Sequence, residues 1–198
     1  MKTLILAGGK SSRMGANKAL LPIRGIRLIE SLVLEFSKVS NEVLIAAGDP
    51  ALYAGLAARV LQDDADYAGE GPLAGMHAGF RAAQPGPCFL LACDLPFACP
   101  EIAQEITSIM LRKQADAAVP VSGGRIHPLY AAYDTGVTPR IEKILESGQR
   151  SVRSLLDSIN TEYIPFGSLA GHRPEMLWNM NTPLDYEKAR GVAEQKGR

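Results

Sequence analysis

An apolar run at the start of the chain ends in two glycines, which are followed by a polar and basic loop. The run spans residues 2–7, the length of a buried strand in a parallel sheet. Gly8 and Gly9 let the backbone approach a ligand closely, and Arg13 and Lys18 add a guanidinium and an ammonium. A strand that ends in this way is typical of a loop that presents backbone N–H groups to a phosphate. The pattern predicts a phosphate-binding loop, while a plain glycine turn with solvated cations fits the same residues.

Two well-known phosphate loops do not match this segment. A P-loop requires a glycine five residues before its Gly-Lys-Ser sequence. Gly9-Lys10-Ser11 is present, but Leu4 occupies that earlier position, inside the expected strand. The dinucleotide fingerprint requires Gly-x-Gly directly after the strand, and residue 10 is a lysine. The loop therefore belongs to neither class.

Segments with strand and helix patterns alternate along the rest of the chain. We expect further strands over residues 42–47, 59–61, 87–93, 116–121, 127–133 and 163–166. We expect helices over residues 26–39, 51–58, 73–84, 100–113, 138–147 and 152–158, and a last helix after Pro183. The alternation predicts one α/β domain over residues 1–198, a three-layer α/β/α sandwich with a mostly parallel sheet and right-handed crossovers. In such a sheet, ligands bind beyond the carboxyl ends of the strands.

Composition and charge narrow the functional classes. Lysine plus arginine and aspartate plus glutamate number 21 each, so the zero net charge gives no general basic field for nucleic acid. The sequence shows no secretory signal and no apolar run of the roughly 18–20 residues that a membrane span needs. Cys88, Cys93 and Cys99 form no C-x-x-C pair, which argues against a zinc site or a disulfide framework. We expect a cytoplasmic protein without nucleic-acid or membrane partners.

Two aspartates follow expected strands. Asp94 closes the apolar run 87–93, where a carboxylate is costly unless it is paired or binds a cation. Mg²⁺ prefers one or two carboxylates together with substrate phosphates, which suits Asp94 opposite a phosphate loop, although a turn or N-cap aspartate before Pro96 has the same pattern. Asp63 follows residues 59–61 and either contacts a ribose hydroxyl or the metal, or is merely solvated. With Asn181, these residues are expected to converge on one cleft.

Three further features have weaker signals. Residues 69–74 match Gly-x-Gly-x-x-Ala formally, but Pro72 lacks an N–H group, so this glycine-rich segment suggests close backbone packing over a ligand instead. Residues 149–153 are basic and polar and either hold a second anionic substrate or begin a solvated helix. Cys93 has no histidine partner in any motif and is interpreted as a small core residue.

Five motifs occur in order along nearly the whole chain. They are Leu6-Ala7-Gly8-Gly9 through Arg13-Met14-Gly15 to Lys18, Gly71-Pro72-Leu73-Ala74-Gly75, Cys93-Asp94-Leu95-Pro96, His127-Pro128-Leu129 and Asn179-Met180-Asn181-Thr182-Pro183. Together they resemble the molybdenum cofactor guanylyltransferases, the MobA family of nucleotidyltransferases, which have a Rossmann-like, glycosyltransferase-A-like fold. The Gly8-Gly9 pair favours the guanylyl member, since the related cytidylyltransferases typically read Ala-Ala-Gly there.

The resemblance implies a nucleotide site formed by backbone groups and two cations. The glycine-rich and apolar positions that would bind the nucleotide are Leu6, Ala7, Gly8, Gly9 and Gly75. Arg13 and Lys18 would bind the triphosphate and act in catalysis, and Asp63 would make the acidic nucleotide contact. The family often has an asparagine near the end of the second strand, where this chain has Ala46 or Ala47.

The resemblance also implies the metal, the acceptor and the reaction. Asp94 would bind Mg²⁺, with Mn²⁺ as a substitute, and Asn181 would lie near the metal or the pterin. Residues 1–95 would mainly bind GTP and residues 96–198 mainly molybdopterin or molybdenum cofactor. The acceptor's terminal phosphate would attack the α-phosphorus of GTP and release pyrophosphate. Cofactor-insertion proteins or molybdoenzymes would be transient partners.

Two alternatives remain open at this point. One is another Mg²⁺-dependent nucleotidyltransferase of this fold, which uses CTP or acts on a sugar phosphate. The other is a nucleotide-binding module without turnover, against which the presence of both Lys18 and Asp94 argues.

Overall fold

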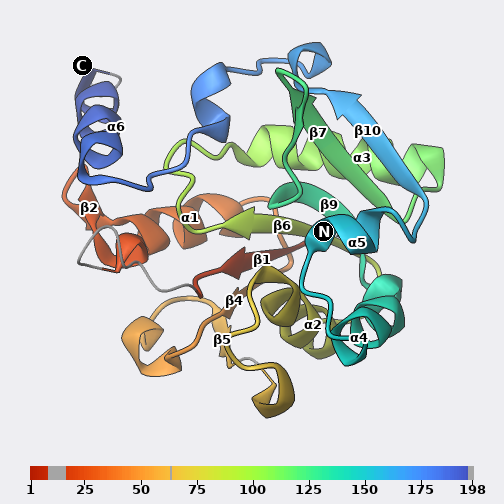
Figure 1. Ribbon diagram of the computed structural model, residues 1–198. Coiled ribbons are helices and arrows are strands. Elements are labelled where there is room, and N and C mark those ends of the chain that lie inside the picture. Colours follow the sequence, from red (N-terminus) through yellow and green to blue (C-terminus); the bar gives the residue numbers. More distant parts are fainter. Residues whose placement is uncertain (9–16, 63, 196–198) are drawn as a thin grey trace.

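One mixed sheet forms the centre of the protein (Figure 1). The computed structural model describes residues 1–8, 17–62 and 64–195. The strands of this sheet are β1 Lys2–Leu6, β4 Glu42–Ala46, β5 Arg59–Leu61, β6 Pro87–Ala92, β7 Ala117–Ser122, β8 Arg125–Ile126, β9 Tyr130–Asp134 and β10 Thr161–Pro165. Their order is β10-β7-β9-β6-β1-β4-β5, and β8 pairs with β7. A separate hairpin consists of β2 Pro22–Ile23 and β3 Ile26–Arg27.

The expected mostly parallel sheet is confirmed. Parallel pairs join β1 to β4, β1 to β6, β4 to β5 and β7 to β10. The exceptions are β9, which is antiparallel to β6 and β7, and β8, which is antiparallel to β7. The β1, β4 and β6 strands therefore end at the same edge of the sheet, as the sequence pattern predicts.

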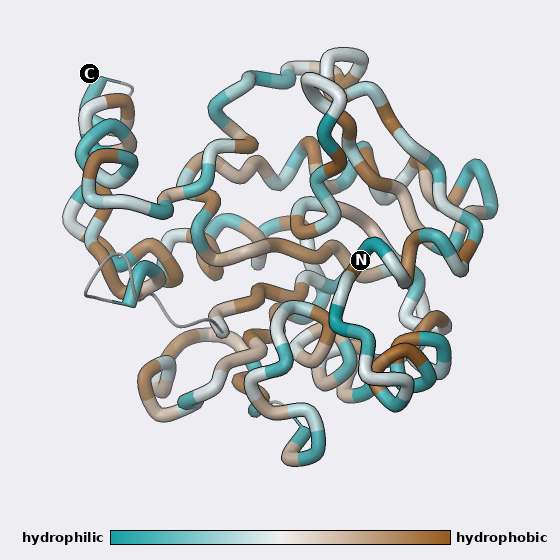
Figure 2. The backbone as a smooth tube through the Cα atoms, in the orientation of Figure 1, coloured by the Kyte–Doolittle hydropathy of each residue, from teal (hydrophilic) through white to brown (hydrophobic). Residues whose placement is uncertain are grey.

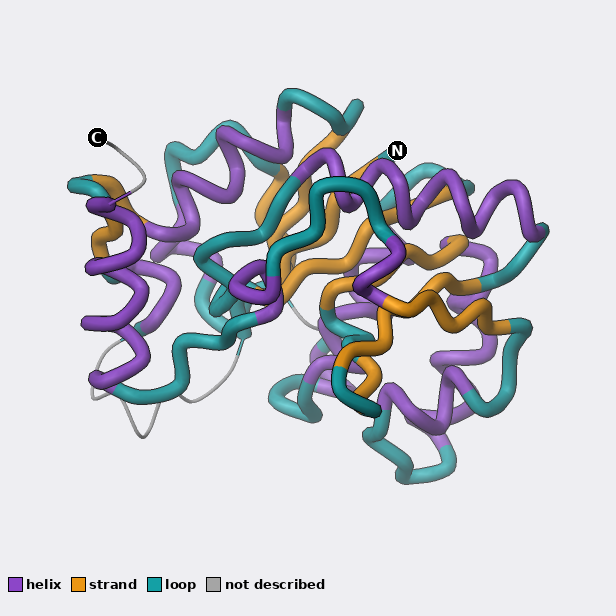
Figure 3. Tube along the Cα trace, turned by 90° about the horizontal axis from the view of Figure 1, so that it is seen from above, coloured by secondary structure: helices purple, strands orange, loops and turns teal. Residues whose placement is uncertain are grey.

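Helices cover both faces of the sheet, as Figure 3 shows from above. The helices are α1 Leu28–Ser37, α2 Pro72–Ala82, α3 Pro100–Lys113, α4 Thr138–Glu146, α5 Val152–Leu156 and α6 Pro183–Gln195. On one face the core includes α1, α3 and α6 residues, and on the other it includes α2, α4 and α5 residues. Side chains alternate along β1, with Ile5 in the first core and Leu4 and Leu6 in the second. Figure 2 shows long hydrophobic stretches along the central strands β1 and β6.

The α2 helix packs very closely on β1. A Cβ atom at Gly79 would lie 2.2 Å from Cδ2 of Leu4, so any larger residue at this crossing would force the Leu4 side chain to move. This approach fixes the height of α2 above the sheet and brings its N-terminus to the carboxyl edge of β1. In the described parts of the chain, no helix combines the length and apolar character needed to cross a bilayer.

Three expected elements differ from the structure. The α1 helix begins at Leu28 rather than residue 26, because Arg24 and Gly25 turn with φ of 54° and 81° and Ile26 pairs with Ile23. The helix expected over 51–58 is a single 3₁₀ turn, Pro50–Tyr53. Gly55, with φ of 86°, is incompatible with its continuation.

The strand expected over 127–133 is also displaced. The β9 strand begins at Tyr130, because the N–H of Tyr130 bonds to the carbonyl of His127 in a turn that contains Pro128. Residues 125–126 form the short β8 strand instead. The turn at Gly123 and Gly124, with φ of 55° and 73°, joins β7 to β8 as a hairpin.

Candidate active site

A cleft of about 740 Å³ lies at the carboxyl edge of the sheet. Its lining includes residues that follow β1, β4 and β6, the start of α2, and Asn179. Ala7 extends the pairing beyond β1 through a hydrogen bond from its N–H to the carbonyl of Ala46, and Cys93 donates its N–H to the carbonyl of Leu6. The floor of the cleft therefore continues the hydrogen bonding of the sheet.

Lys18 and Asp94 face each other in this cleft. Nζ of Lys18 is 3.7 Å from Oδ2 of Asp94 and donates a 2.6 Å hydrogen bond to Oδ1 of Asn181. The Lys18 and Asp94 side chains are each 17% exposed. Because Lys18 and Asn181 are 163 positions apart, the structure brings the first and last of the predicted site motifs together.

The environment of Asp94 disfavours an isolated charge. Burial raises the pKa of Asp94 above its ordinary value, and the charge of Lys18, with smaller contributions that include Asn179, acts in the opposite direction. Among the described residues, Oδ1 of Asp94 is buried and has no hydrogen-bond partner. A buried carboxylate oxygen without a partner is costly. It fits a hard cation such as Mg²⁺, which combines one or two carboxylates with substrate phosphate oxygens.

Asn17 and Tyr53 fix the position of Lys18. Asn17 caps a 3₁₀ turn, Lys18–Leu20, by accepting a hydrogen bond from the N–H of Ala19. Its Nδ2 donates to the hydroxyl of Tyr53, which in turn donates to the carbonyl of Ala7. This chain of hydrogen bonds ties the residue before Lys18 to the end of β1. Tyr53 is almost fully buried, so the link is held on all sides by the core.

The Asn-x-Asn-Thr-Pro motif forms a strap over Asp94. The N–H of Met180 bonds to the carbonyl of Asp94 at 2.9 Å. Thr182 and Asp185 then form a capping box at the start of α6, with each side chain accepting the other's backbone N–H. Asp185 also accepts the N–H of Asn181, and hydrogen bonds from Thr182 and Asn181 hold the pKa of Asp185 below its ordinary value. The strap thus places Asn181 beside Lys18.

The glycine-rich segment before α2 lines another wall of the cleft. Gly69 and Gly71 adopt φ of 78° and 82°, and Gly71 directly precedes α2. Glu70 between them forms an ion pair with Arg150. Arg150, in the segment considered for a second anionic substrate, also donates to the carbonyls of Leu145 and Gln149. Through these contacts Arg150 holds the glycine-rich segment against the end of α4.

Most of the predicted site residues that the structure describes meet in this cleft. Those that line it are Leu6, Ala7, Gly8, Lys18, Gly75 and Asp94, while Asn181 reaches it through Lys18. Gly9, Arg13 and Asp63 lie outside the described residues. Sequence reasoning gave no site role to Asn17, Tyr53 or Asn179. Asn17 lies within the first motif and Asn179 within the Asn-x-Asn-Thr-Pro motif, whereas Tyr53 had no signal in the sequence.

Cys93 lies in the cleft but is not suited to nucleophilic chemistry. Burial raises the pKa of its thiol to about 12, and the adjacent charge of Asp94 acts in the same direction. The thiol is therefore protonated at neutral pH. This agrees with the interpretation of Cys93 as a small packing residue.

A mostly parallel sheet with a cleft at the carboxyl ends of its strands is typical of nucleotide-binding α/β proteins. The family model for the MobA-like NTP transferase domain matches residues 3–162. A probable molybdenum cofactor guanylyltransferase of Carboxydothermus hydrogenoformans is 37% identical over 93% of this chain and 92% of its own length. The molybdenum cofactor guanylyltransferase of Yersinia pestis is 34% identical over 98% and 95%, respectively.

Solved structures give the same result. The molybdopterin-guanine dinucleotide biosynthesis protein A of Archaeoglobus fulgidus superposes with a TM-score of 0.86 at 27% identity, covering 98% of this chain and all of that one. The chain belongs to the MobA-like NTP transferase family, and it is a nucleotidyltransferase. The resemblance seen in the sequence motifs is thereby confirmed.

Proposed function

We propose that this enzyme transfers GMP from GTP to the terminal phosphate of molybdopterin or molybdenum cofactor. The relatives named above as molybdenum cofactor guanylyltransferases support this choice of donor and acceptor. The observation that carries the chemistry is the unpartnered Oδ1 of Asp94, which lies beside the ammonium of Lys18 on the cleft floor. A carboxylate and a cation in this arrangement suit a metal-bound triphosphate.

In this proposal, Asp94 holds Mg²⁺, or Mn²⁺ as a substitute. When bound, the metal would neutralise charge on the phosphate oxygens of GTP. Lys18 and Arg13 bind the triphosphate, and the hydrogen bond from Lys18 to Asn181 keeps the ammonium aimed at it. The preorganised ammonium stabilises the charge that develops during transfer.

The transfer itself needs no protein nucleophile. The acceptor is a phosphate monoester whose second pKa is about 6, so it is mostly a dianion at neutral pH and needs no general base. One of its oxygens forms a bond to the α-phosphorus of GTP as the bond to the bridging oxygen breaks. The electron pair of that bond leaves with pyrophosphate. The role of the protein is to place the two phosphates in line and to balance their charge.

The remaining residues are assigned to nucleotide and acceptor binding. The positions proposed for guanine and ribose are Leu6, Ala7, Gly8, Gly9, Asp63 and Gly75. Residues 1–95 would mainly hold the nucleotide and residues 96–198 the acceptor. The three free thiols Cys88, Cys93 and Cys99 suit a reducing compartment, and we place the reaction in the cytoplasm, with transient handover to insertion proteins or molybdoenzymes.

Thermal shift with four nucleotides tests the choice of donor. We expect GTP with Mg²⁺ to raise the melting temperature more than CTP, UTP or ATP, because only a ligand that binds the folded state stabilises it. Omission of the metal should reduce the shift. Stabilisation by CTP alone would overturn the guanylyl assignment, and binding of GTP without pyrophosphate release in the presence of molybdopterin would favour a non-catalytic module.

A further inference from the structure

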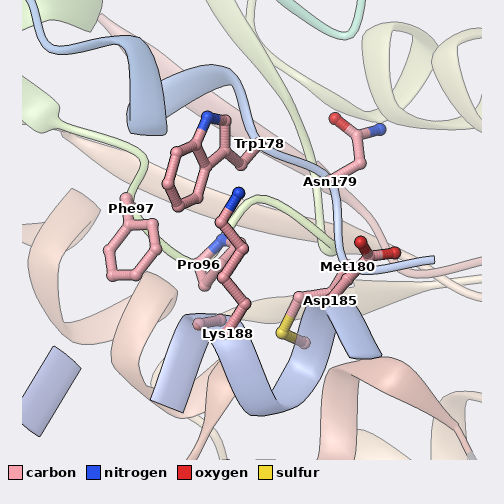
Figure 4. Close-up of a pocket in the computed structure, with 8 residues that line it drawn as sticks. Pro96, Phe97, Trp178, Asn179, Met180, Asp185 and Lys188 are labelled. Atoms are coloured by element: carbon pink, nitrogen blue, oxygen red, sulfur yellow. The ribbon is translucent and has the colours of Figure 1, made fainter. Parts of the chain in front are cut away.

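A second, smaller pocket lies on the other side of the strap. Figure 4 shows it between the segment after β6 and the start of α6. Its volume is about 220 Å³, and its walls include Phe97, Trp178, Asp185 and Lys188. Nothing in the mechanism proposed above uses these four side chains, although the pocket directly adjoins the catalytic cleft.

The walls of this pocket are aromatic and carry one charge of each sign. The rings of Phe97 and Trp178 meet edge to face, with their centroids 6.2 Å apart. Nζ of Lys188 lies 3.9 Å from the centroid of the Trp178 ring, and Figure 4 shows its side chain directed toward the indole. Asp185 uses Oδ2 for its bonds to the strap, and no described residue bonds to its Oδ1. The pocket is thus lined by two aromatic rings, an ammonium and a carboxylate oxygen.

The strap connects this pocket to the reaction site. Asn179 lines both cavities, and Figure 4 shows its side chain pointing away from Phe97 and Trp178. The next residue, Met180, bonds to the backbone of Asp94. A ligand ring in the small pocket would therefore lie next to Asn179, and the following residue, Met180, is bonded to Asp94 in the catalytic cleft.

We propose that this pocket binds the pterin ring of the acceptor. The inference rests on the proposed function and names the acceptor's binding site, which that function leaves open. A pterin has two flat faces that stack on aromatic side chains, as nucleobases do. Its 2-amino-4-oxo edge combines N–H donors with a carbonyl acceptor, which complement the Asp185 carboxylate and the Lys188 ammonium. The acceptor's phosphate then extends past Asn179 toward Lys18 and Asp94.

The sizes of the two cavities assign one substrate to each. Pockets for drug-sized ligands measure roughly 300–1,000 Å³. The main cleft, at about 740 Å³, is large enough for a nucleoside triphosphate, whereas about 220 Å³ accommodates a compact ring system only. Guanine and pterin share the same pyrimidine edge, so ring chemistry alone does not show which ring each cavity binds. A competition experiment between a pterin and GTP distinguishes the two cavities.

Fluorescence gives a direct binding test, because Trp178 is the only tryptophan in the chain. The purified protein is titrated with 6-hydroxymethylpterin, which carries no phosphate, in the absence and presence of saturating GTP and Mg²⁺. We expect saturable quenching of Trp178 that GTP does not displace, and at least about tenfold weaker binding in Phe97→Leu, which removes one aromatic wall. No saturable quenching, displacement by GTP, or equal affinity in Phe97→Leu would each overturn the proposal.

Steady-state kinetics separates the pocket from the reaction. We expect Trp178→Leu to raise KM for molybdopterin at least about tenfold while the thermal shift with GTP stays unchanged. Trp178→Phe, which keeps an aromatic ring, should have a KM close to that of the wild type. Tyr163→Leu, a half-exposed aromatic on β10 that lines neither cavity, is the matched control. Wild-type KM in Trp178→Leu would refute the pocket while the function stands. Absence of any GMP transfer by the wild type would refute the function, and the pterin titration would still decide on the pocket.

Discussion

Asp94→Asn is the substitution that most sharply separates activity from stability in this protein. Asparagine keeps the shape of the side chain but removes the charge that the proposed metal requires. Metal ions supply several kcal/mol of transition-state charge stabilisation, and each 1.36 kcal/mol is a factor of ten in rate. We therefore expect kcat for pyrophosphate release from GTP and molybdopterin to fall by about 10²–10⁴-fold.

The same substitution should not destabilise the fold. The pKa of Asp94 is raised because burial outweighs the attraction of Lys18, so above that pKa the ionised carboxylate lowers the free energy of unfolding. Asparagine leaves a polar atom at the position of Oδ1, which has no partner among the described residues, so the two side chains differ mainly in the buried charge. We expect Asp94→Asn to be as stable as the wild type or more stable by about 1 kcal/mol, which is about 2–4 °C in Tm for a chain of this size.

The stability difference between the wild type and Asp94→Asn should depend on pH. As the pH falls through the raised pKa of Asp94, the folded wild type binds a proton before the unfolded chain does. The difference in the free energy of unfolding between Asp94→Asn and the wild type therefore becomes smaller. It disappears below the ordinary value of 3.8, where the unfolded carboxyl is also protonated. Differential scanning calorimetry between pH 4 and pH 8 measures the gap, with Asp134→Asn at the opposite edge of the sheet as the control. A loss of stability at pH 7, or activity within tenfold of the wild type, would contradict the assigned role of Asp94.

Four further substitutions test other parts of the structure. Lys18→Gln removes the ammonium and should lower kcat/KM for GTP by about 10²–10³-fold, measured by pyrophosphate release, and a smaller change than tenfold would contradict its role. Gly79→Ala forces a methyl group against Leu4 and should cost about 1–3 kcal/mol in urea unfolding. Gly191→Ala, in α6 with no atom within 4 Å of the added carbon, should instead stabilise by about 0.5–1 kcal/mol. Tyr53→Phe should cost about 0.5–1.5 kcal/mol in the same assay and weaken GTP binding, because it breaks the link between Asn17 and β1.

Strong local patterns predicted the sheet and most of the helices. The run 87–93 is too apolar for anything but a buried strand, and β6 occupies residues 87–92 of it. The helix expected over 100–113 matches α3 residue for residue, since Pro100 fits its first position and the left-handed Gln114 ends it. The carboxyl-edge rule then predicted that Gly8 and Asp94, at the ends of neighbouring strands, meet in one cleft.

The parts that sequence reasoning missed depend on distant contacts. Tyr53 became part of the site because its hydroxyl joins Asn17 to Ala7, and no local periodicity encodes a link across 46 positions. The Phe97–Trp178 pocket joins residues 81 positions apart, so neither residue is distinctive on its own. Arg150 was interpreted from its charge alone, while the structure shows that Glu70 compensates it.

The conversion of molybdopterin by the wild-type enzyme is the decisive measurement of GMP transfer. Purified protein is incubated with GTP, Mg²⁺ and molybdopterin, and the pterin products are followed by mass spectrometry. We expect a product in which one GMP unit is joined to molybdopterin through a new pyrophosphate linkage, with one pyrophosphate released for each. A product formed with CTP and not with GTP would contradict GMP transfer. The absence of a product with any nucleotide, although GTP binds, would contradict it as well.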